Sequence, residues 1–284
     1  MNGEVMSLSA SSRALSILLL SVSLVTAAAA EDSTVVTDVQ QCNAQGGESP
    51  GQQIAGCADL IKSATNPKTL AIIYNNRGNA YVRSEQYDLA IKDYDEAIKD
   101  DPDYARAFNN RGVAYEKKGD YDRALQDFEA AIKISPDYGH AFANRAETYL
   151  KKGDYDGAAK AFDEAIQLQP NLSLLRNERC WTRAIIGDLS AALADCNAVV
   201  QSTPNEAAPF DSRGLVYLKM NRLESAIADY SAALKISPKL PSALYGRGLA
   251  ELKSGNLAAG NADISAAKSI DPNIVDEFSR YRFE

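Results

Sequence analysis

Several residue types that build reactive sites are scarce in this chain. Its 284 residues include one histidine, His140, and one tryptophan, Trp181. A single histidine leaves little for a histidine-based metal cluster or for a Ser-His-Asp arrangement. Neither a Cys-x-x-Cys pair nor a glycine-rich phosphate loop occurs. We therefore predict no catalytic residue, no metal site and no cofactor, and we expect that the protein is not an enzyme.

Positive charge is also in short supply. The chain has 30 lysines and arginines against 38 acidic residues, which gives a formal net charge of -8. Binding to nucleic acid needs a dense cationic surface, because the phosphate backbone dominates affinity. Nucleic acid is therefore not an expected partner.

The chain has one long hydrophobic run, and that run is too short to span a bilayer. It extends from Ala14 to Val25, after Arg13, and is followed by a short run of alanines. With Ala28 and Ala30 as the small pair before cleavage, this pattern is typical of a secretory signal peptide. We expect cleavage near Ala30, export, and no membrane span in the mature protein. An uncleaved membrane anchor is the alternative.

A short motif returns at a fixed interval along the rest of the chain. Its arginine recurs every 34 residues, at Arg77, Arg111, Arg145, Arg179, Arg213 and Arg247. A proline keeps the same spacing, at Pro102, Pro136, Pro170, Pro204, Pro238 and Pro272. This regularity indicates one supersecondary unit stacked six times, with the proline ending its second helix.

Other landmarks in each unit are similar to those of the tetratricopeptide repeat (TPR) family. The second unit carries the whole family pattern of aromatic and small residues, with Phe108, Gly112, Tyr115, Ala124, Phe128, Ala131 and Pro136. The first, third and fifth units match as well, whereas the sixth is degenerate. The resemblance implies an all-α fold, a right-handed superhelix (α-solenoid) of six helix-turn-helix repeats with helical caps.

Alignment on the repeated arginine sets the expected boundaries. After a signal peptide at 1–30, we expect a linker and capping half-repeat at 31–70, six repeats at 71–274, and a C-terminal capping tail at 275–284. The six repeats are 71–104, 105–138, 139–172, 173–206, 207–240 and 241–274.

The four cysteines are predicted to form two disulfides, because export places them in an oxidising compartment. The first pair is Cys42 and Cys57. In the second pair, Cys180 and Cys196 are the eighth and twenty-fourth residues of the fourth repeat, and these positions lie level across an antiparallel helix hairpin. Because this repeat lacks the usual aromatic residues, we expect the bridge to replace lost packing. Two free, buried cysteines are the alternative.

An aspartate follows the repeated arginine sixteen residues later in five repeats, at Asp93, Asp127, Asp195, Asp229 and Asp263. In the third repeat the corresponding residue is Ala161. The two positions are nearly level across the hairpin, so we expect charge-assisted hydrogen bonds between the two helices. Such pairs set register more than they add stability.

The resemblance also implies a concave groove lined by the first helix of each repeat. Asparagines occupy the expected groove positions, at Asn75, Asn76, Asn79, Asn109, Asn110, Asn144 and Asn177. The row Asn76, Asn110 and Asn144 is similar to the asparagine ladder of the superhelical TPR region in O-linked N-acetylglucosamine transferases. A row of amides offers both donors and acceptors to an extended peptide. Bonding to local backbone is the alternative.

Trp181 is predicted to face the same groove as an aromatic anchor, and burial against a neighbouring helix is the alternative. TPR domains that hold a C-terminal carboxylate need cations at positions where this chain has Asn75, His140 and Asn144. We therefore do not expect a carboxylate clamp.

These observations predict an exported adaptor or scaffold that binds an extended protein or peptide segment in its concave groove. The resemblance favours a periplasmic location, or secretion. Two alternatives remain open: a self-assembling structural protein that forms homo-oligomers, and a non-catalytic subunit of an envelope enzyme complex.

Overall fold

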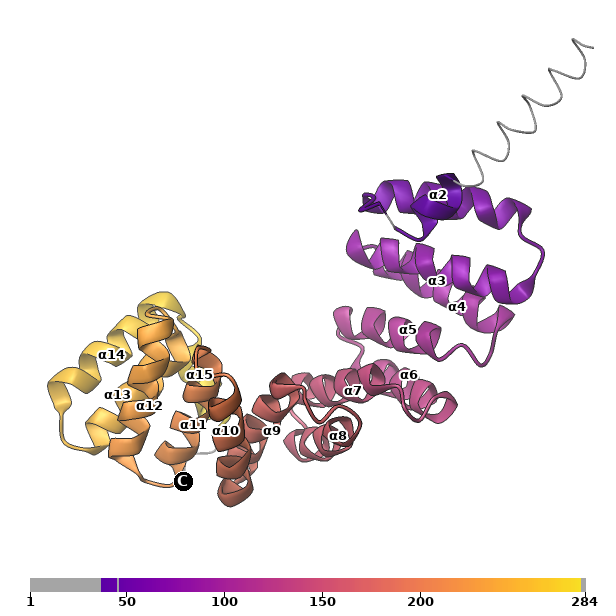
Figure 1. Ribbon diagram of the computed structural model, residues 1–284. Coiled ribbons are helices and arrows are strands. Elements are labelled where there is room, and N and C mark those ends of the chain that lie inside the picture. Colours follow the sequence, from indigo (N-terminus) through magenta and orange to yellow (C-terminus); the bar gives the residue numbers. More distant parts are fainter. Residues whose placement is uncertain (1–36, 45, 282–284) are drawn as a thin grey trace, which may run out of the picture. The chain divides into compact units, whose positions relative to one another are not determined.

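The structure is a computed structural model that describes residues 37–44 and 46–281. The predicted signal peptide at 1–30 lies outside the described residues. Every regular element in the described part of the chain is a helix (Figure 1), which confirms the predicted all-α class.

Residues 37–42 are helical, and the longer helices follow in order. They are α2 (Pro50–Ser63), α3 (Pro67–Arg83), α4 (Tyr87–Asp100), α5 (Ala105–Lys117), α6 (Tyr121–Ile134), α7 (Gly139–Lys152), α8 (Tyr155–Leu168), α9 (Ser173–Ile186), α10 (Leu189–Ser202), α11 (Ala207–Lys219), α12 (Leu223–Ile236), α13 (Pro241–Lys253), α14 (Leu257–Ile270) and α15 (Ile274–Ser279). From α3 to α14 they form consecutive pairs joined by short turns.

The turn inside each pair contains one residue with a left-handed backbone. Four of these residues are glycines, with φ of 78° at Gly119, 80° at Gly153, 91° at Gly187 and 93° at Gly255. The other two are Glu85, with φ of 59°, and Asn221, with φ of 56°. A left-handed residue ends a helix by turning the chain out of its axis, and glycine does so without steric cost. The same backbone device therefore closes the first helix of all six pairs.

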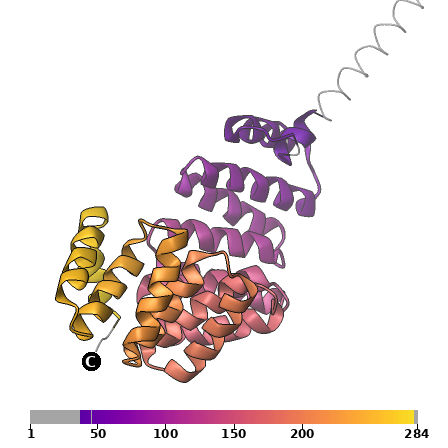
Figure 2. The ribbon, with the colours of Figure 1, turned by 60° about the vertical axis from the view of Figure 1, so that its left-hand side comes forward.

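The chain divides into two compact units, at residues 114 and 115. Unit 1 holds α2, α3, α4 and most of α5, and unit 2 holds α6 to α15. In unit 1, α2 packs on α3 and α3 packs on α4, as successive layers (Figure 1; Figure 2). Small residues fill the space between layers: Ala71, Ala97 and Ala107 are fully buried together.

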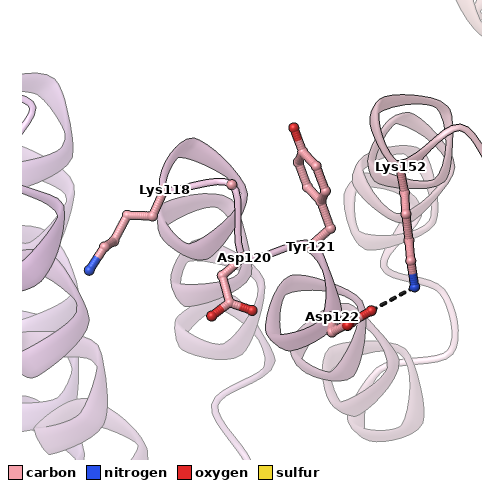
Figure 3. Close-up of a pocket in the computed structure, with 6 residues that line it drawn as sticks. Lys118, Asp120, Tyr121, Asp122 and Lys152 are labelled. Atoms are coloured by element: carbon pink, nitrogen blue, oxygen red, sulfur yellow. Dashed lines mark hydrogen bonds and ion pairs between the residues drawn. The ribbon is translucent and has the colours of Figure 1, made fainter.

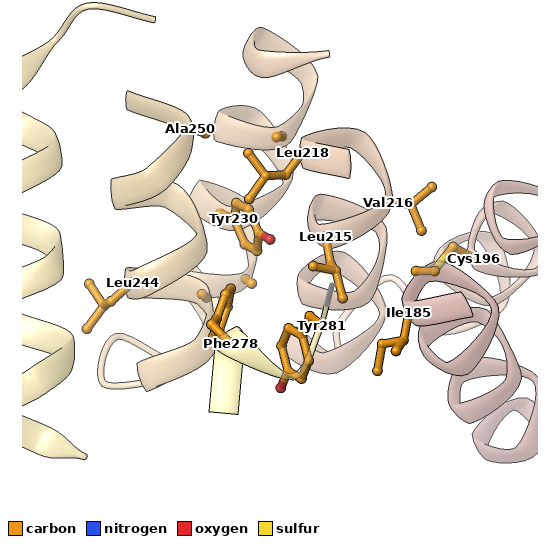
Figure 4. Close-up of a cluster of buried hydrophobic side chains, with 14 of the residues drawn as sticks. Ile185, Cys196, Leu215, Val216, Leu218, Tyr230, Leu244, Ala250, Phe278 and Tyr281 are labelled. Carbon is orange, nitrogen blue, oxygen red and sulfur yellow. The ribbon is translucent and has the colours of Figure 1, made fainter. Parts of the chain in front are cut away.

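Unit 2 contains the largest hydrophobic cluster of the described residues, which spans α9 to α15. Tyr230 of α12 lies at its centre and is 1% exposed. The C-terminal tail, defined here as residues 274–281, contributes Phe278 and Tyr281 to the same cluster (Figure 4). The ring of Phe278 lies 4.7 Å from that of Tyr245 in α13. The tail is thus packed into the core of unit 2.

Both predicted cysteine pairs lie at disulfide-bonding distance. The Cα atoms are 4.6 Å apart for Cys42 and Cys57 and 5.5 Å apart for Cys180 and Cys196. The second pair joins α9 to α10, level across the hairpin, which fits the predicted bridge. All four side chains are buried, with exposures of 1% or less.

The repeated arginines make the predicted contacts inside their own helix pairs. Arg213 Nε donates to Asp229 Oδ2 at 2.6 Å, and its Nη2 donates to Asp229 Oδ1 at 2.9 Å. The same two-pronged bond joins Arg77 to Asp93, Arg179 to Asp195 and Arg247 to Asp263. The bond fixes the register of the two helices.

Each of five arginines also reaches the residue sixteen positions before it, in the preceding helix pair. These partners are Asp95 for Arg111, Glu129 for Arg145, Asp163 for Arg179, Asn197 for Arg213 and Ser231 for Arg247. Where Ala161 removes the forward partner, Arg145 binds Glu164 instead, at 2.7 Å. One side chain therefore links the helices within a pair and also joins consecutive pairs.

Candidate functional site

The predicted asparagine rows differ in how much of each side chain reaches solvent. At the fifth repeat position, exposure is only 4%, 5% and 7% for Asn75, Asn109 and Asn177. The sixth-position residues Asn76, Asn110 and Asn144 are partly exposed, as is Asn79. The sixth-position amides therefore reach solvent, whereas the fifth-position amides are almost fully buried.

In unit 1 these amides bind one another. Asn110 Nδ2 donates to Asn75 Oδ1 at 2.9 Å and to Asn79 Oδ1 at 3.1 Å. Asn76 Nδ2 donates to Asn43 Oδ1 at 3.0 Å. Since Asn75 and Asn79 lie on α3 and Asn110 lies on α5, the bonds join the first helices of neighbouring pairs. Here the asparagines contribute to packing between repeats.

In unit 2 the first helices line an open pocket of about 400 Å³. Its lining residues come from α7, α9, α11 and α13 and from the C-terminal tail, and they include Asn177, Glu178, Trp181, Asp211, Glu277 and Tyr281. Two of the predicted groove residues, Asn177 and Trp181, share this pocket. Asn144 is not among its lining residues. We call it the Trp181 pocket.

Trp181 is partly exposed and forms one wall of the pocket. Its ring meets the ring of Tyr155 edge-on, with centroids 6.1 Å apart. It meets Tyr281 of the tail in the same manner at 5.3 Å. The main chain of the tail is held in place as well, because Lys219 Nζ donates to the carbonyl oxygen of Tyr281 at 2.7 Å. The tail therefore forms part of the pocket wall beside Trp181 of α9.

The polar groups of the Trp181 pocket are mainly hydrogen-bond acceptors. Burial raises the pKa of Asp211 to about 7, although a 2.6 Å hydrogen bond from the Ser242 hydroxyl favours the ionised form. Burial also raises the pKa of Glu178, and the nearby charge of Glu147 adds to this shift. Asn177 Oδ1 is buried and accepts no hydrogen bond. Among the described residues, Glu178 and Asp211 thus have no cationic partner and the amide oxygen of Asn177 has no N–H partner.

A second hollow, of about 360 Å³, lies at the turn between α5 and α6 (Figure 3). Its charged groups already have partners: Lys152 Nζ lies 2.6 Å from Asp122 Oδ1, and Asp120 Oδ2 accepts a bond from Arg123 Nε at 2.5 Å. Asp120 also caps the N-terminus of α6. These contacts stabilise a turn and leave little for a ligand.

Sequence reasoning missed the acidic side of the Trp181 pocket. Glu178 and Asp211 occupy the sixth and fifth positions of their repeats, where the first repeats have asparagine. That change from amide to carboxylate was the available signal. The repeat pattern gave no sign that Tyr281 would line the pocket. Tyr281 lies outside the repeats, and its contact with Trp181 joins residues that are 100 positions apart.

Within residues 37–44 and 46–281, no group of three or more histidine, cysteine or acidic side chains is placed to hold a metal ion. In the same residues, no helix combines the length and the apolar character needed to cross a bilayer.

Comparison with protein families gives two matches. A family model described as "Tetratricopeptide repeat" matches residues 75–139, 117–173 and 143–207. A second model, described as "TPR repeat", matches residues 214–255. Comparison with curated proteins found no match.

Solved structures with the same fold include several repeat proteins. YrrB, described as a TPR protein with an unusual peptide-binding site, shares 26% identity at a TM-score of 0.59, covering 67% of this chain and 97% of its own. A tetratricopeptide repeat protein from Parabacteroides merdae shares 16% identity at a TM-score of 0.65, covering 88% of this chain and 99% of its own. The type IV pilus biogenesis factor PilW shares 18% identity at a TM-score of 0.61, covering 73% of this chain and 98% of its own.

Proposed function

Because this chain belongs to the tetratricopeptide repeat family, we propose that it is an exported adaptor that binds an extended segment of another protein on its first helices. In this family, stacked helix pairs present a long surface, and that surface suits extended partners. The adaptor is non-catalytic, and it brings proteins together rather than transforming a substrate.

The observation that carries the proposal is the composition of the Trp181 pocket. All of its lining residues lie on the first helices of four successive pairs or on the C-terminal tail. A large aromatic ring beside hydrogen-bonding groups is the usual make-up of a site that anchors a partner's side chain. Sixth-position amides such as Asn144 offer further donors and acceptors along the same series of helices.

Two other findings support the proposal. YrrB is described as having a peptide-binding site, and its likeness to this chain extends over 67% of the chain. The two cysteine pairs at disulfide-bonding distance support export, because disulfides persist in oxidising compartments such as the periplasm. Cleavage near Ala30 then releases the mature protein into the periplasm or the medium.

The proposal is tested by selecting displayed random peptides on the full chain and measuring the affinity of those recovered. We expect replacement of Trp181 by alanine to lower the affinity for the selected peptides by about tenfold or more, since aromatic anchors dominate the binding energy of such interfaces. The matched control is Lys160→Ala, on the exposed surface of the second helix α8. Peptides that bind both variants with unchanged affinity would contradict a site on the first helices.

A further inference from the structure

Among the described residues, the Trp181 pocket has more hydrogen-bond acceptors than donors to pair with them. We propose that it receives the guanidinium group of an arginine side chain carried by the bound segment. This inference rests on the proposed function and specifies the chemistry of the partner. It differs from a carboxylate clamp, which holds an anion with cations.

The first observation is the unpartnered amide of Asn177. Its side chain is 7% exposed, yet its Oδ1 atom accepts no hydrogen bond. Burying a carbonyl oxygen without a donor is unfavourable, and such groups are rare in folded proteins. Asn177 is among the residues that line the pocket, so a bound N–H donor would lie near this oxygen.

The second observation is uncompensated negative charge. Within the described residues, neither Glu178 nor Asp211 is paired with a cation, and the one bond to Asp211 comes from the neutral Ser242. Lys151, which also lines the pocket, is bound to Glu116 with Nζ 2.6 Å from Oε1. Burial raises the pKa of Glu178 and of Asp211, because it disfavours their charged forms. A bound cation would remove that penalty.

The third observation is the aromatic wall. Trp181 and Tyr281 line the pocket together, and their ring centroids are 5.3 Å apart. A guanidinium group stacks on aromatic faces and carries five N–H donors in one plane. The acceptors come from α9 and α11, and a guanidinium group presents a fork of donors in fixed directions, which a single ammonium group lacks.

The size of the pocket and the net charge of the protein both suit a guanidinium group. Its volume of about 400 Å³ lies within the range of ordinary ligand sites. The formal net charge of -8 attracts basic partners over a longer distance.

The experiment uses Trp181 as its own reporter, because it is the single tryptophan of the chain. Its fluorescence is followed while the full chain is titrated with the blocked peptide acetyl-Gly-Ala-Arg-Ala-Gly-amide. The matched probe has citrulline in place of arginine, which keeps the shape and removes the charge. We expect the arginine peptide to bind about tenfold more tightly, because hydrogen bonds between charged groups are stronger than neutral ones. A lysine peptide should fall between the two.

Variants locate the site. Asp211→Asn and Glu178→Gln should each reduce the preference for arginine over citrulline to about threefold or less. Glu206→Gln, an equal change of charge at an exposed residue before α11, should leave the preference unchanged. Circular dichroism of each variant checks that it is folded. If a variant does not fold, the comparison of the arginine and citrulline peptides on the unmodified chain still tests the inference.

Two outcomes would overturn the inference. Equal binding of the arginine and citrulline peptides would exclude a cation site and leave the peptide-binding adaptor intact, provided that selected peptides still require Trp181. If Glu206→Gln lowers the preference for arginine as much as Asp211→Asn and Glu178→Gln do, the preference comes from the overall charge of the protein and not from the pocket. If the display selection yields no peptide that binds the unmodified chain, the proposed function itself is contradicted.

Discussion

Arg183 Nη2 donates a 2.8 Å hydrogen bond to Asp163 Oδ1, across the boundary between two consecutive helix pairs. Its Nη1 atom donates to Asp195 Oδ2 at 2.9 Å, and Arg179 binds both aspartates as well. Arg183 stands where most of these repeats have tyrosine. The fourth repeat has thus exchanged an aromatic contact for a network of two arginines and two aspartates beside the Cys180–Cys196 bridge.

The arginine series predicts unequal losses of stability on substitution. Arg213→Ala would leave Asp229, which is 7% exposed, without its cation, whereas Arg145→Ala would free only the exposed side chains of Glu129 and Glu164. Breaking a buried pair costs about 3 kcal/mol, because an unpaired charge remains inside the protein. We therefore expect Arg213→Ala to lower the free energy of unfolding in urea by about 2 kcal/mol more than Arg145→Ala. Equal losses would show that the arginines act only through packing.

The left-handed residue inside each helix pair predicts a stabilising substitution. Glu85 is exposed and adopts φ of 59° in a position where four other repeats have glycine. A left-handed backbone costs an ordinary residue about 1 kcal/mol, so Glu85→Gly should raise the free energy of unfolding by up to about that amount. Asparagine tolerates this conformation better, so Asn221→Gly should have a smaller effect. Thermal unfolding of the two variants checks the order, and destabilisation by Glu85→Gly would contradict it.

Periodicity alone predicted much of this fold, for a physical reason. Two residues face each other across a helix hairpin when their positions within the repeat add up to a constant. The contact of Arg213 with Asp229 and the proximity of Cys180 to Cys196 can therefore be predicted from the repeat positions alone. The backward contacts, such as Arg179 with Asp163, depend on the distance between neighbouring pairs. That distance is set by packing and is not visible in a single repeat.

The candidate site was less predictable. Trp181 and Asn177 were identified from their repeat positions, and the structure places both in one pocket. The burial of the fifth-position asparagines was not apparent, since a polar residue gives no sign that its amide will bind the next repeat. The tail was harder still, because the contact of Tyr281 with Trp181 joins residues outside any common period.

The cysteine pairs predict a protein with no accessible thiol. Alkylation of the unreduced, denatured protein should label none of the four cysteines, and mass spectrometry should show two bridges, Cys42–Cys57 and Cys180–Cys196. Replacing Cys180 and Cys196 together by serine should lower the free energy of unfolding by about 3 kcal/mol. This is the free energy that the chain-entropy model assigns to a bridge that closes a loop of that size in the unfolded chain. Labelling of any cysteine before reduction would contradict the corresponding bridge.

Asp211 predicts an unusual dependence of stability on pH. Burial raises its pKa from an ordinary value of 3.8 to about 7 in the folded protein. A raised folded-state pKa means that the folded state binds the proton more tightly, so this contribution to stability is complete below the unfolded value and is lost as pH rises towards 7. Other titratable groups share its surroundings, namely Glu178, Glu277, Tyr230 and Tyr281.

The matched variant for this prediction is Asp211→Asn, which cannot titrate. Its melting temperature should exceed that of the unmodified chain above about pH 7, and the difference should shrink steadily as pH falls towards about 4. The neighbouring Glu277 titrates in both proteins, so subtraction removes much of its effect. A difference that is independent of pH would show that Asp211 is ionised throughout this range.

The C-terminal tail predicts that one buried ring controls the surroundings of Trp181. Phe278 is 4% exposed and contacts both Tyr245 and Tyr281, at 4.7 and 4.8 Å. Phe278→Ala should cost about 3 kcal/mol, and because α15 is only 6 residues long and buries few side chains, the cost should appear as local detachment before global unfolding. Detachment moves Tyr281 away from Trp181, so tryptophan emission should shift to longer wavelength at temperatures where circular dichroism still reports native helix. Val275→Ala, at a residue that is 38% exposed on the same helix, should leave the emission unchanged. A Phe278→Ala variant with unaltered emission and lowered global stability would show that the ring supports the last repeats and leaves the Trp181 pocket unaffected.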